Sequence, residues 1–522
     1  MGIYDLKAPD ADFRTLSRWG LQHLQRVVAI DSQSNEKSLT IPSTEGQKEL
    51  SQDLESFFSS FGYEVHRDQC ANLVVRIPAT VDDAPKLALM VHIDTAEGTQ
   101  ALQTLSRTVA WTGAPISYPA NSRLNVSASA YPSTQNFLGE DLIHGPGDAP
   151  FGLDDKLGMA HLMSLARILS EPGYRHGEVL LVFRPDEEIG RMEALESLAH
   201  ELAASGVRHG YTIDGIAPFE VNVENFNAAG ARVTTPATSI DVGTHRAVIR
   251  IHGVKSHGAT AKAEGYLNAL TVAARCLNEW PDSVTPIYFM TDSLSETSAR
   301  LKLASNRLSD ISVAIKVLKD MLEPHKVRGA YLDVESQYVD DSPASDSVVR
   351  ALNFVSCFIA SEGPFPRLSE DSEGWEGYSN PYSLTMVPSG GSILRFRLRD
   401  FDAGALEARC AHVARIASSL GLAEQLVIES QYTNMGPQLA KFPELVQWAV
   451  EALKPLNIEP AVDPIRGGTG VDPFLARGIG IANLGTGYFA PESEKEFTSE
   501  QSLARHAEWL TYLVQVVGAH SA

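Results

Sequence analysis

Hydrophobic and polar positions along the chain alternate between extended and helical patterns. Residues 86–94 are nearly all apolar, which is typical of a strand buried on both faces of a sheet, and residues 177–188 predict another buried strand that runs into acids. Over residues 154–171, apolar side chains instead recur at helical spacing. Further strands are predicted at 72–79, 208–215 and 479–487, and further helices at 14–30, 45–61, 443–456 and 502–520. This alternation predicts an α/β fold with a mixed, mostly parallel sheet flanked by helices.

A different pattern occupies the middle of the chain. A helix is predicted at 310–322, and the cleanly alternating residues 392–402 predict a strand with one buried face. The 522 residues also exceed the roughly 250–300 that a single core usually organises. We therefore predict one domain from residues 1–217 and 416–522, and an inserted α+β domain over 218–415.

Composition narrows the classes of function. The net charge is −22, from 43 basic and 65 acidic residues, which argues against binding to nucleic acid or to an anionic membrane. The four cysteines lack the spacing of a disulfide framework or a cysteine zinc site, and a reducing compartment fits them. The N-terminus does not resemble a secretory signal, and no apolar run approaches the roughly 20 residues of a membrane span. We expect a cytoplasmic protein.

Side chains of the kind that bind metals follow three of the predicted strands. His92 and Asp94 end the first, Glu187 and Glu188 follow the second, and Asp214 lies in the third. In an open parallel sheet, ligands bind outside the carboxyl ends of the strands, so these groups are expected to meet in one crevice. Taken singly, each has a simpler explanation, such as a solvated acidic loop or a chance pairing.

Two adjacent carboxylates, Asp154 and Asp155, stand at the start of a predicted helix in the segment GLDDKLGMA. Asp154 by itself could serve as an N-cap. However, carboxylates crowd together in a poor dielectric only when a cation compensates them, so the pair indicates that one aspartate bridges two divalent metals. Ligands of Asp, Glu and His suit zinc, or manganese or cobalt if oxygen ligands dominate.

Nine segments occur in the order found in one known family: HIDTA, GLDDKLGMA, RPDEEIGR, YTIDG, ENFNAA, HGATAKAEGYLNAL, RDFD, IRGGT and KEF. Between about residues 65 and 505 the chain resembles the aminoacylase-like di-zinc metallopeptidases. The resemblance implies a catalytic domain with two metals and an inserted lid domain through which members often form homodimers. Residues of about 284–365 match weakly and are interpreted as an extra lid segment.

The resemblance also implies a ligand set. His92 and Asp214 would hold one metal and Glu188 the other, while Asp154 would bridge both through a segment whose Asp154–Asp155 peptide bond is often cis. Asp94 would orient the imidazole of His92.

One position departs from the family pattern. The family places a histidine ligand four or five residues before a glutamate near the C-terminus, whereas this chain has Glu492 four residues before Glu496. Glu492 would then complete an oxygen-rich site that favours a harder ion such as manganese. The alternatives are a weak second site or a protein that has lost activity.

The remaining roles concern catalysis and substrate. Glu187 would be the general base acting on a water that bridges the metals. His257 would stabilise the oxyanion, reaching in from a partner subunit in dimeric members, although a surface loop is its simpler explanation. Asn227 and Arg399 would line the cleft, and Arg466 would bind the terminal carboxylate of a peptide. A structural ion pair is the alternative for both arginines.

The expected activity is hydrolysis of an amide bond in a small peptide substrate, with release of the N-terminal residue of tripeptides as the first expectation. One alternative is an amidohydrolase acting on N-acyl amino acids or dipeptides. Another is an inactive binding homologue whose second metal site has degraded.

Overall fold

The computed structural model describes residues 6–191, 193–258, 260–293 and 295–521. The chain forms two compact units. The first comprises Met1–Asn121, Thr134–Asn225 and Asn434–Ala522, and the second comprises Ser122–Ser133 and Phe226–Thr433. The boundaries therefore fall eight and eighteen residues later than the sequence pattern indicates. The first shift arises because Glu220–Asn222 pairs with strands of the first unit, and the second because Leu426–Tyr432 pairs with a strand of the second unit.

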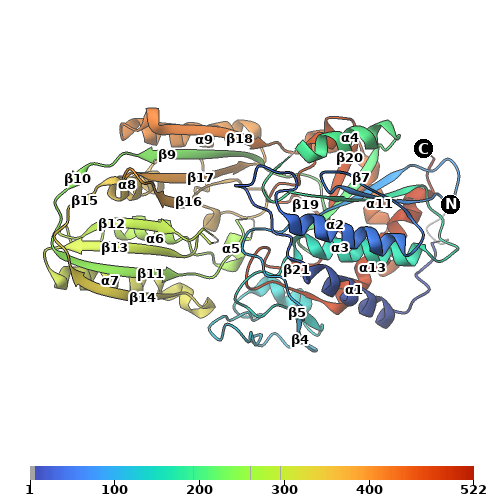
Figure 1. Ribbon diagram of the computed structural model, residues 1–522, viewed down its shortest axis with the longest axis horizontal. Helices are drawn as coiled ribbons and strands as arrows, with labels where there is room; N and C mark the ends of the chain where they lie inside the picture. The colour runs from blue at the N-terminus through green and yellow to red at the C-terminus, as the bar shows by residue number, and fades with distance from the viewer. Residues whose placement is uncertain (1–5, 192, 259, 294, 522) are drawn as a thin grey trace. The chain divides into compact units, whose positions relative to one another are not determined.

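The described residues of the first unit contain an eight-stranded sheet (Figure 1). Its order is β1 (Glu64–Arg67), β2 (Leu73–Ile77), β6 (Val179–Arg184), β3 (Leu87–His92), β7 (His209–Gly215), β20 (Gly480–Gly485), β8 (Glu220–Asn222) and β19 (Ala461–Asp463). The four central strands β6, β3, β7 and β20 are parallel neighbours, whereas β2 runs antiparallel to β6 and β8 antiparallel to β20. The predicted mixed, mostly parallel sheet is confirmed.

Helices cover both faces of this sheet because the central strands are apolar on both sides. In β3, Leu89 and Val91 pack into the core on one face, and Ala88 and Met90 pack into the core on the other. The first face is covered by α1 (Phe13–Val28), α2 (Glu45–Ser59), α3 (Leu153–Leu169), α11 (Pro443–Glu451) and α13 (Glu500–Gly518), and the second by α4 (Glu193–Ala204) and α12 (Asp472–Leu475). The helix and strand positions inferred from hydrophobic spacing are confirmed to within a few residues at their ends.

A small sheet brings two distant segments of the first unit together. It contains β21 (Tyr488–Phe489), β22 (Phe497–Ser499), β5 (Leu142–His144) and β4 (Ser106–Thr108) in that order. Because β22 pairs with β5, residues just before the C-terminal helix lie beside the approach to α3. The remaining short elements of this unit are α10 (Gly436–Leu439), η6 (Lys454–Leu456) and most of η2 (Pro132–Phe137).

The second unit is antiparallel α+β, as its alternating pattern predicts. One four-stranded sheet has the order β12 (Thr285–Thr291), β13 (Ala299–Ser305), β11 (His245–His252) and β14 (Tyr331–Val339). The other has the order β16 (Tyr378–Met386), β17 (Ser392–Asp400), β9 (Asn227–Thr235) and β18 (Leu426–Tyr432). Their shared core includes residues of α6 (Ala269–Cys276), α7 (Leu308–Leu322), α8 (Ser347–Ala360) and α9 (Ala403–Ser419). The short elements are β10 (Ser239–Ile240), α5 (Ala261–Glu264), η3 (Glu323–Arg328), β15 (Ala344–Ser345), η4 (Ser369–Asp371) and η5 (Ala423–Gln425).

Candidate active site

Three neighbouring parallel strands bring their polar ends to one edge of the sheet. His92 is the last residue of β3 and pairs in register with Arg184, the last residue of β6. Glu187 and Glu188 lie in the turn that follows β6, and Asp214 lies near the end of β7, which pairs with β3 on its other side. The parallel topology thus places the groups that sequence analysis singled out beside one another.

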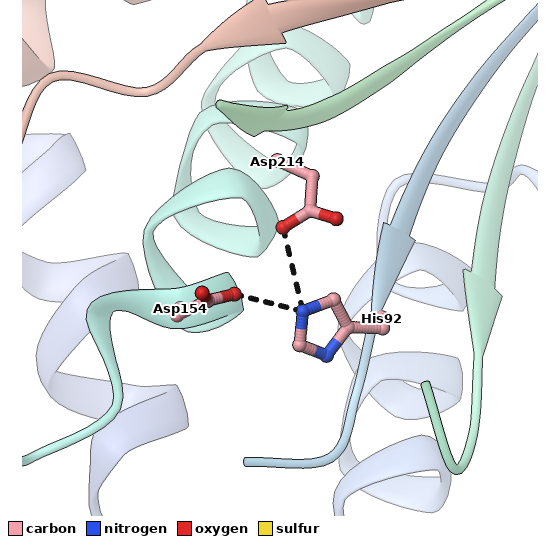
Figure 2. A group of neighbouring side chains, drawn as sticks. All are labelled: His92, Asp154 and Asp214. Carbon is pink, nitrogen blue, oxygen red and sulfur yellow. Dashed lines mark hydrogen bonds and ion pairs between the residues drawn. The ribbon is translucent and has the colours of Figure 1, made fainter. Parts of the chain in front are cut away.

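His92 is the centre of a first cluster of metal-type ligands. Its Nε2 lies 2.9 Å from Asp154 Oδ1 and 3.4 Å from Asp214 Oδ1. Figure 2 shows both carboxylates directed at this one ring nitrogen, Asp154 from the start of α3 and Asp214 from β7. One ligand atom from each residue lies within 4.8 Å of the other two. These spacings suit three ligands of a single ion.

A second cluster shares Asp154. One carboxylate oxygen each from Asp154, Glu188 and Glu492 lies within 4.8 Å of the others. The structure thus groups Glu492, whose φ is +51°, with two of the predicted ligands. Two adjoining clusters that share one aspartate have the layout of a dinuclear metal site.

The raised pKa values of carboxyl groups in both clusters are consistent with sites for cations. Burial, together with Asp214 and Glu492, raises the pKa of Asp154 to about 8. Burial and the nearby carboxylates of Glu492 and Asp154 raise the pKa of Glu188 well above its usual value. Glu188 Oε1 is buried and has no hydrogen-bond partner among the described residues. Acids this crowded are stabilised in their charged form by divalent cations, so the residues present fit such ions.

Asp94 fixes the orientation of the first-cluster histidine and of the acidic turn. Its Oδ1 lies 3.3 Å from His92 Nδ1, and its carboxylate accepts the backbone N–H groups of Glu187 at 2.9 Å and Glu188 at 3.1 Å. Burial opposes the charge of Asp94, but the hydrogen bonds from His92 and these two N–H groups outweigh burial and lower its pKa. Burial also opposes the charged form of His92 and so acts to lower its pKa. The carboxylates of Asp214 and Asp154 outweigh burial and raise the pKa of His92 well above its usual value.

The start of α3 is held by a glutamate from the far end of the chain. Glu496 Oε2 accepts the backbone N–H groups of Phe151, Gly152 and Leu153 at 3.0, 3.0 and 3.4 Å. A carboxylate at a helix N-terminus also interacts favourably with the helix dipole. Glu496 therefore fixes the backbone from which Asp154 extends.

Asp154 and Asp155 have separate tasks. The peptide bond between them is cis, as the resemblance implies. Asp154 accepts a hydrogen bond of 3.2 Å from the Tyr488 hydroxyl at Oδ2. Asp155 points elsewhere: its carboxylate accepts the backbone N–H of His92 at 3.1 Å and that of Gly158 at 3.2 Å. Asp154 thus contributes to the ligand clusters, whereas Asp155 holds the backbone beside them.

Glu187 lies beside the clusters with its side chain 17% exposed. Burial raises its pKa, and the guanidinium of Arg184, whose Nη2 lies 3.8 Å from Glu187 Oε1, opposes that rise. Sequence analysis did not single out Arg184 or Tyr488. A cation at the end of the otherwise apolar run VLLVFR is a signal for Arg184, whereas the sequence offers none for Tyr488.

The other predicted residues are distributed over both units. Arg466 belongs to the first unit, between β19 and α12, and is 8% exposed. His257, Asn227 and Arg399 belong to the second unit. Asn227 donates to the carbonyl of Phe401 at 2.8 Å, and Arg399 donates to backbone carbonyls within its own sheet. The half-buried His257 follows β11.

Comparison with known proteins assigns the family. A family model described as peptidase family M20/M25/M40 matches residues 133–516. The chain belongs to this family. Membership of M20/M25/M40 makes it a hydrolase of the metallopeptidase class, which confirms the resemblance inferred from the nine motifs.

Individual M20/M25/M40 relatives match nearly the whole chain. Peptidase T of Lysinibacillus sphaericus is 25% identical over 509 residues, covering 95% of this chain and 97% of the relative. Peptidase T of a Geobacillus species is 27% identical over 478 residues, covering 90% of each chain. A crystal structure of a tripeptidase from Staphylococcus aureus shares the fold, with a TM-score of 0.52, 16% identity, and coverage of 97% and 99%. Among the described residues, no helix combines the length and apolarity that a membrane crossing requires.

Proposed function

We propose that this chain removes the N-terminal residue from tripeptides with the help of two divalent metal ions. The observation that carries the proposal is the pair of ligand clusters joined at Asp154, with Glu187 next to Glu188 at their edge. The similarity to enzymes named peptidase T along almost the full chain supports peptides as the substrate class.

His92, Asp154 and Asp214 would hold one ion, and Asp154, Glu188 and Glu492 the other. When bound, the ions would polarise the scissile carbonyl and lower the pKa of the attacking water. Zinc suits the first position because imidazole and carboxylates are its ordinary ligands. The second position offers carboxylates alone, which favours a harder ion such as manganese.

Glu187 would take the proton from the attacking water and pass it to the leaving amine. Its burial favours this role because a raised pKa makes a carboxylate a stronger base. Asp94 would hold both His92 and the backbone of Glu187 in place through the hydrogen bonds described above.

The second unit would supply the lid. His257 would stabilise the oxyanion, from its own chain or from the partner subunit of a homodimer, and Asn227 and Arg399 would line the cleft. Arg466 would pair with the terminal carboxylate of the peptide, since guanidinium and carboxylate match in a bidentate pair. The four free cysteines, all among the described residues, fit a cytoplasmic location, where thiols stay reduced.

The decisive experiment measures metal content and substrate range on the same preparation. The protein is stripped with a chelator and reloaded with zinc, manganese or cobalt, then offered tripeptides, dipeptides and N-acyl amino acids. Two bound metals and release of N-terminal amino acids from tripeptides support the proposal. Turnover of N-acyl amino acids or dipeptides alone would instead indicate the amidohydrolase. A vacant second position without turnover would indicate a binding homologue.

A further inference from the structure

Arg184 is a fully buried cation beside the proposed general base. Its side chain is 1% exposed, and the residue lies at the end of β6. A guanidinium in such a place is stabilised by charge compensation and by hydrogen bonds from its N–H groups. Compensation comes from two carboxylates: Arg184 Nη2 lies 3.8 Å from Glu187 Oε1 and 3.9 Å from Asp214 Oδ2.

The hydrogen bonds of Arg184 go to a different part of the chain. Nη1 donates to the carbonyl of Gly470 at 2.9 Å, and Nη2 donates to the carbonyl of Thr469 at 3.0 Å. The two Nη groups of the planar guanidinium, here called the fork, therefore bind two successive carbonyls of residues 466–470, the segment that begins with Arg466.

Gly470 shows how closely these parts meet. It has a φ of +57°, and a Cβ at this position would lie 2.3 Å from Arg184 Nη1 and 2.9 Å from Glu187 Oε1. The backbone at Gly470 thus touches both the guanidinium and the carboxylate. No side chain fits there without displacing one of them.

We propose that Arg184 is a positioning residue that fixes residues 466–470 relative to the carboxylate of Glu187. This role rests on the proposed peptide hydrolysis, in which Arg466 binds the substrate carboxylate. The fork then sets the spacing between the group that anchors one end of the substrate and the base that acts on the attacking water. Small displacements of such groups reduce rates strongly.

The test compares a tripeptide with its C-terminal amide, which lacks the carboxylate that Arg466 would bind. Arg184→Lys keeps the charge and removes the fork. We expect kcat to fall about tenfold or more for both substrates because Glu187 is no longer fixed. KM should rise about tenfold for the free tripeptide and stay within about twofold for the amide, because only the former uses Arg466. Metal content should be unchanged.

Gly470→Ala tests the same contact without removing any charge, and it decides the question if Arg184→Lys does not fold. It should reproduce both effects. Gly478→Ala is its control, because Gly478 also has a positive φ, of +73°, but open space around a Cβ. Arg191→Lys is the control for the arginine, since Arg191 also donates to loop carbonyls, those of Thr40 and Glu36 among them.

The outcomes separate the two proposals. If the wild type hydrolyses no peptide, the proposed function fails. If the wild type is active while Arg184→Lys and Gly470→Ala keep its kcat and its KM ratio between the two substrates, only the positioning role is overturned. The positioning role is equally overturned if the Arg191 and Gly478 controls lose activity in the same way.

Discussion

At the scale of single residues, Asp154 is the side chain that both ligand clusters share. It contributes an oxygen to the cluster with His92 and Asp214 and to the cluster with Glu188 and Glu492. Its pKa of about 8 means that, without cations, the carboxyl group would be largely protonated at neutral pH. Cations would bring it into its charged form, so the binding of metal should release protons.

Glu187→Gln separates chemistry from metal binding. Glutamine has nearly the same size but cannot accept the proton, so we expect kcat to fall by about 10²–10⁴-fold. Both metals should remain bound, because Glu187 belongs to neither cluster. Metal analysis and peptide turnover on one sample measure both. Glu193→Gln, at the exposed start of α4, is the matched control and should behave as wild type.

Glu492→His tests the oxygen-rich second position. An imidazole there should increase the preference for zinc over manganese at one of the two sites, because nitrogen ligands suit zinc better. Competitive titration, with free manganese followed by its electron paramagnetic resonance signal, gives the ratio of the two affinities. Glu494→His, in the same turn, should leave that ratio unchanged. An unchanged ratio in Glu492→His would remove Glu492 from the ligand set.

At the scale of secondary structure, the position of the site residues depends on how closely α3 packs against the sheet. A Cβ on Gly158 in α3 would lie 2.2 Å from the carbonyl oxygen of Ile213 in β7 and 2.9 Å from Val91 Cγ1 in β3. The helix can pack this closely only because position 158 has no side chain. This contact holds the Asp154 end of the helix against the strands that carry His92 and Asp214.

Gly158→Ala should therefore destabilise the protein by about 3 kcal/mol, since backbone atoms, not a flexible side chain, would have to move. Chemical denaturation gives the free energy of unfolding. The matched control is Gly404→Ala in α9, where a Cβ would meet only the carboxylate of Asp402 at 3.2 Å. Because alanine is the better helix former, the control should be neutral or slightly stabilising. Equal losses in both variants would contradict the close packing of α3.

At the scale of the whole molecule, buried neutral histidines link folding to pH. His161 in α3 and His506 in α13 stack with ring centroids 4.7 Å apart, and His161 Nε2 lies 2.9 Å from the carbonyl of Thr486. Burial lowers the pKa of His161 to about 4 and that of His506 well below its usual value. The rings are therefore neutral in the folded protein at pH values where the unfolded chain binds protons.

The sign of the pH effect follows from this difference. His161 has its full effect on stability above about pH 6.5, the usual histidine pKa, and that stability is lost as the pH falls from 6.5 towards 4. Each pH unit in this window costs about 1.4 kcal/mol, so His161 contributes on the order of 3 kcal/mol. His161→Gln should show a shallower decline of unfolding free energy between pH 6.5 and 4.5. His200→Gln, on the exposed side of α4, should keep the wild-type slope.

The sequence by itself determined the central strands, their burial on two faces, and the acids at their carboxyl ends, because these follow from local spacing and from the geometry of parallel sheets. His92, Asp94, Glu187, Glu188 and Asp214 could be named as candidates for that reason, and the pair Asp154 and Asp155 for its crowding at a helix start. The choice of metal ligands among them came from the family resemblance. Comparison of the C-terminal segment with the family pattern supplied Glu492 as a further candidate.

Only the tertiary structure decided that Glu492 lies with Asp154 and Glu188, that Glu496 caps α3, and that Arg184 grips the carbonyl of Gly470. The separation in the chain is 286 residues for Arg184 and Gly470 and 344 for Gly152 and Glu496. No periodicity of side chains encodes such a pairing, because it depends on which loops the packed sheets bring together.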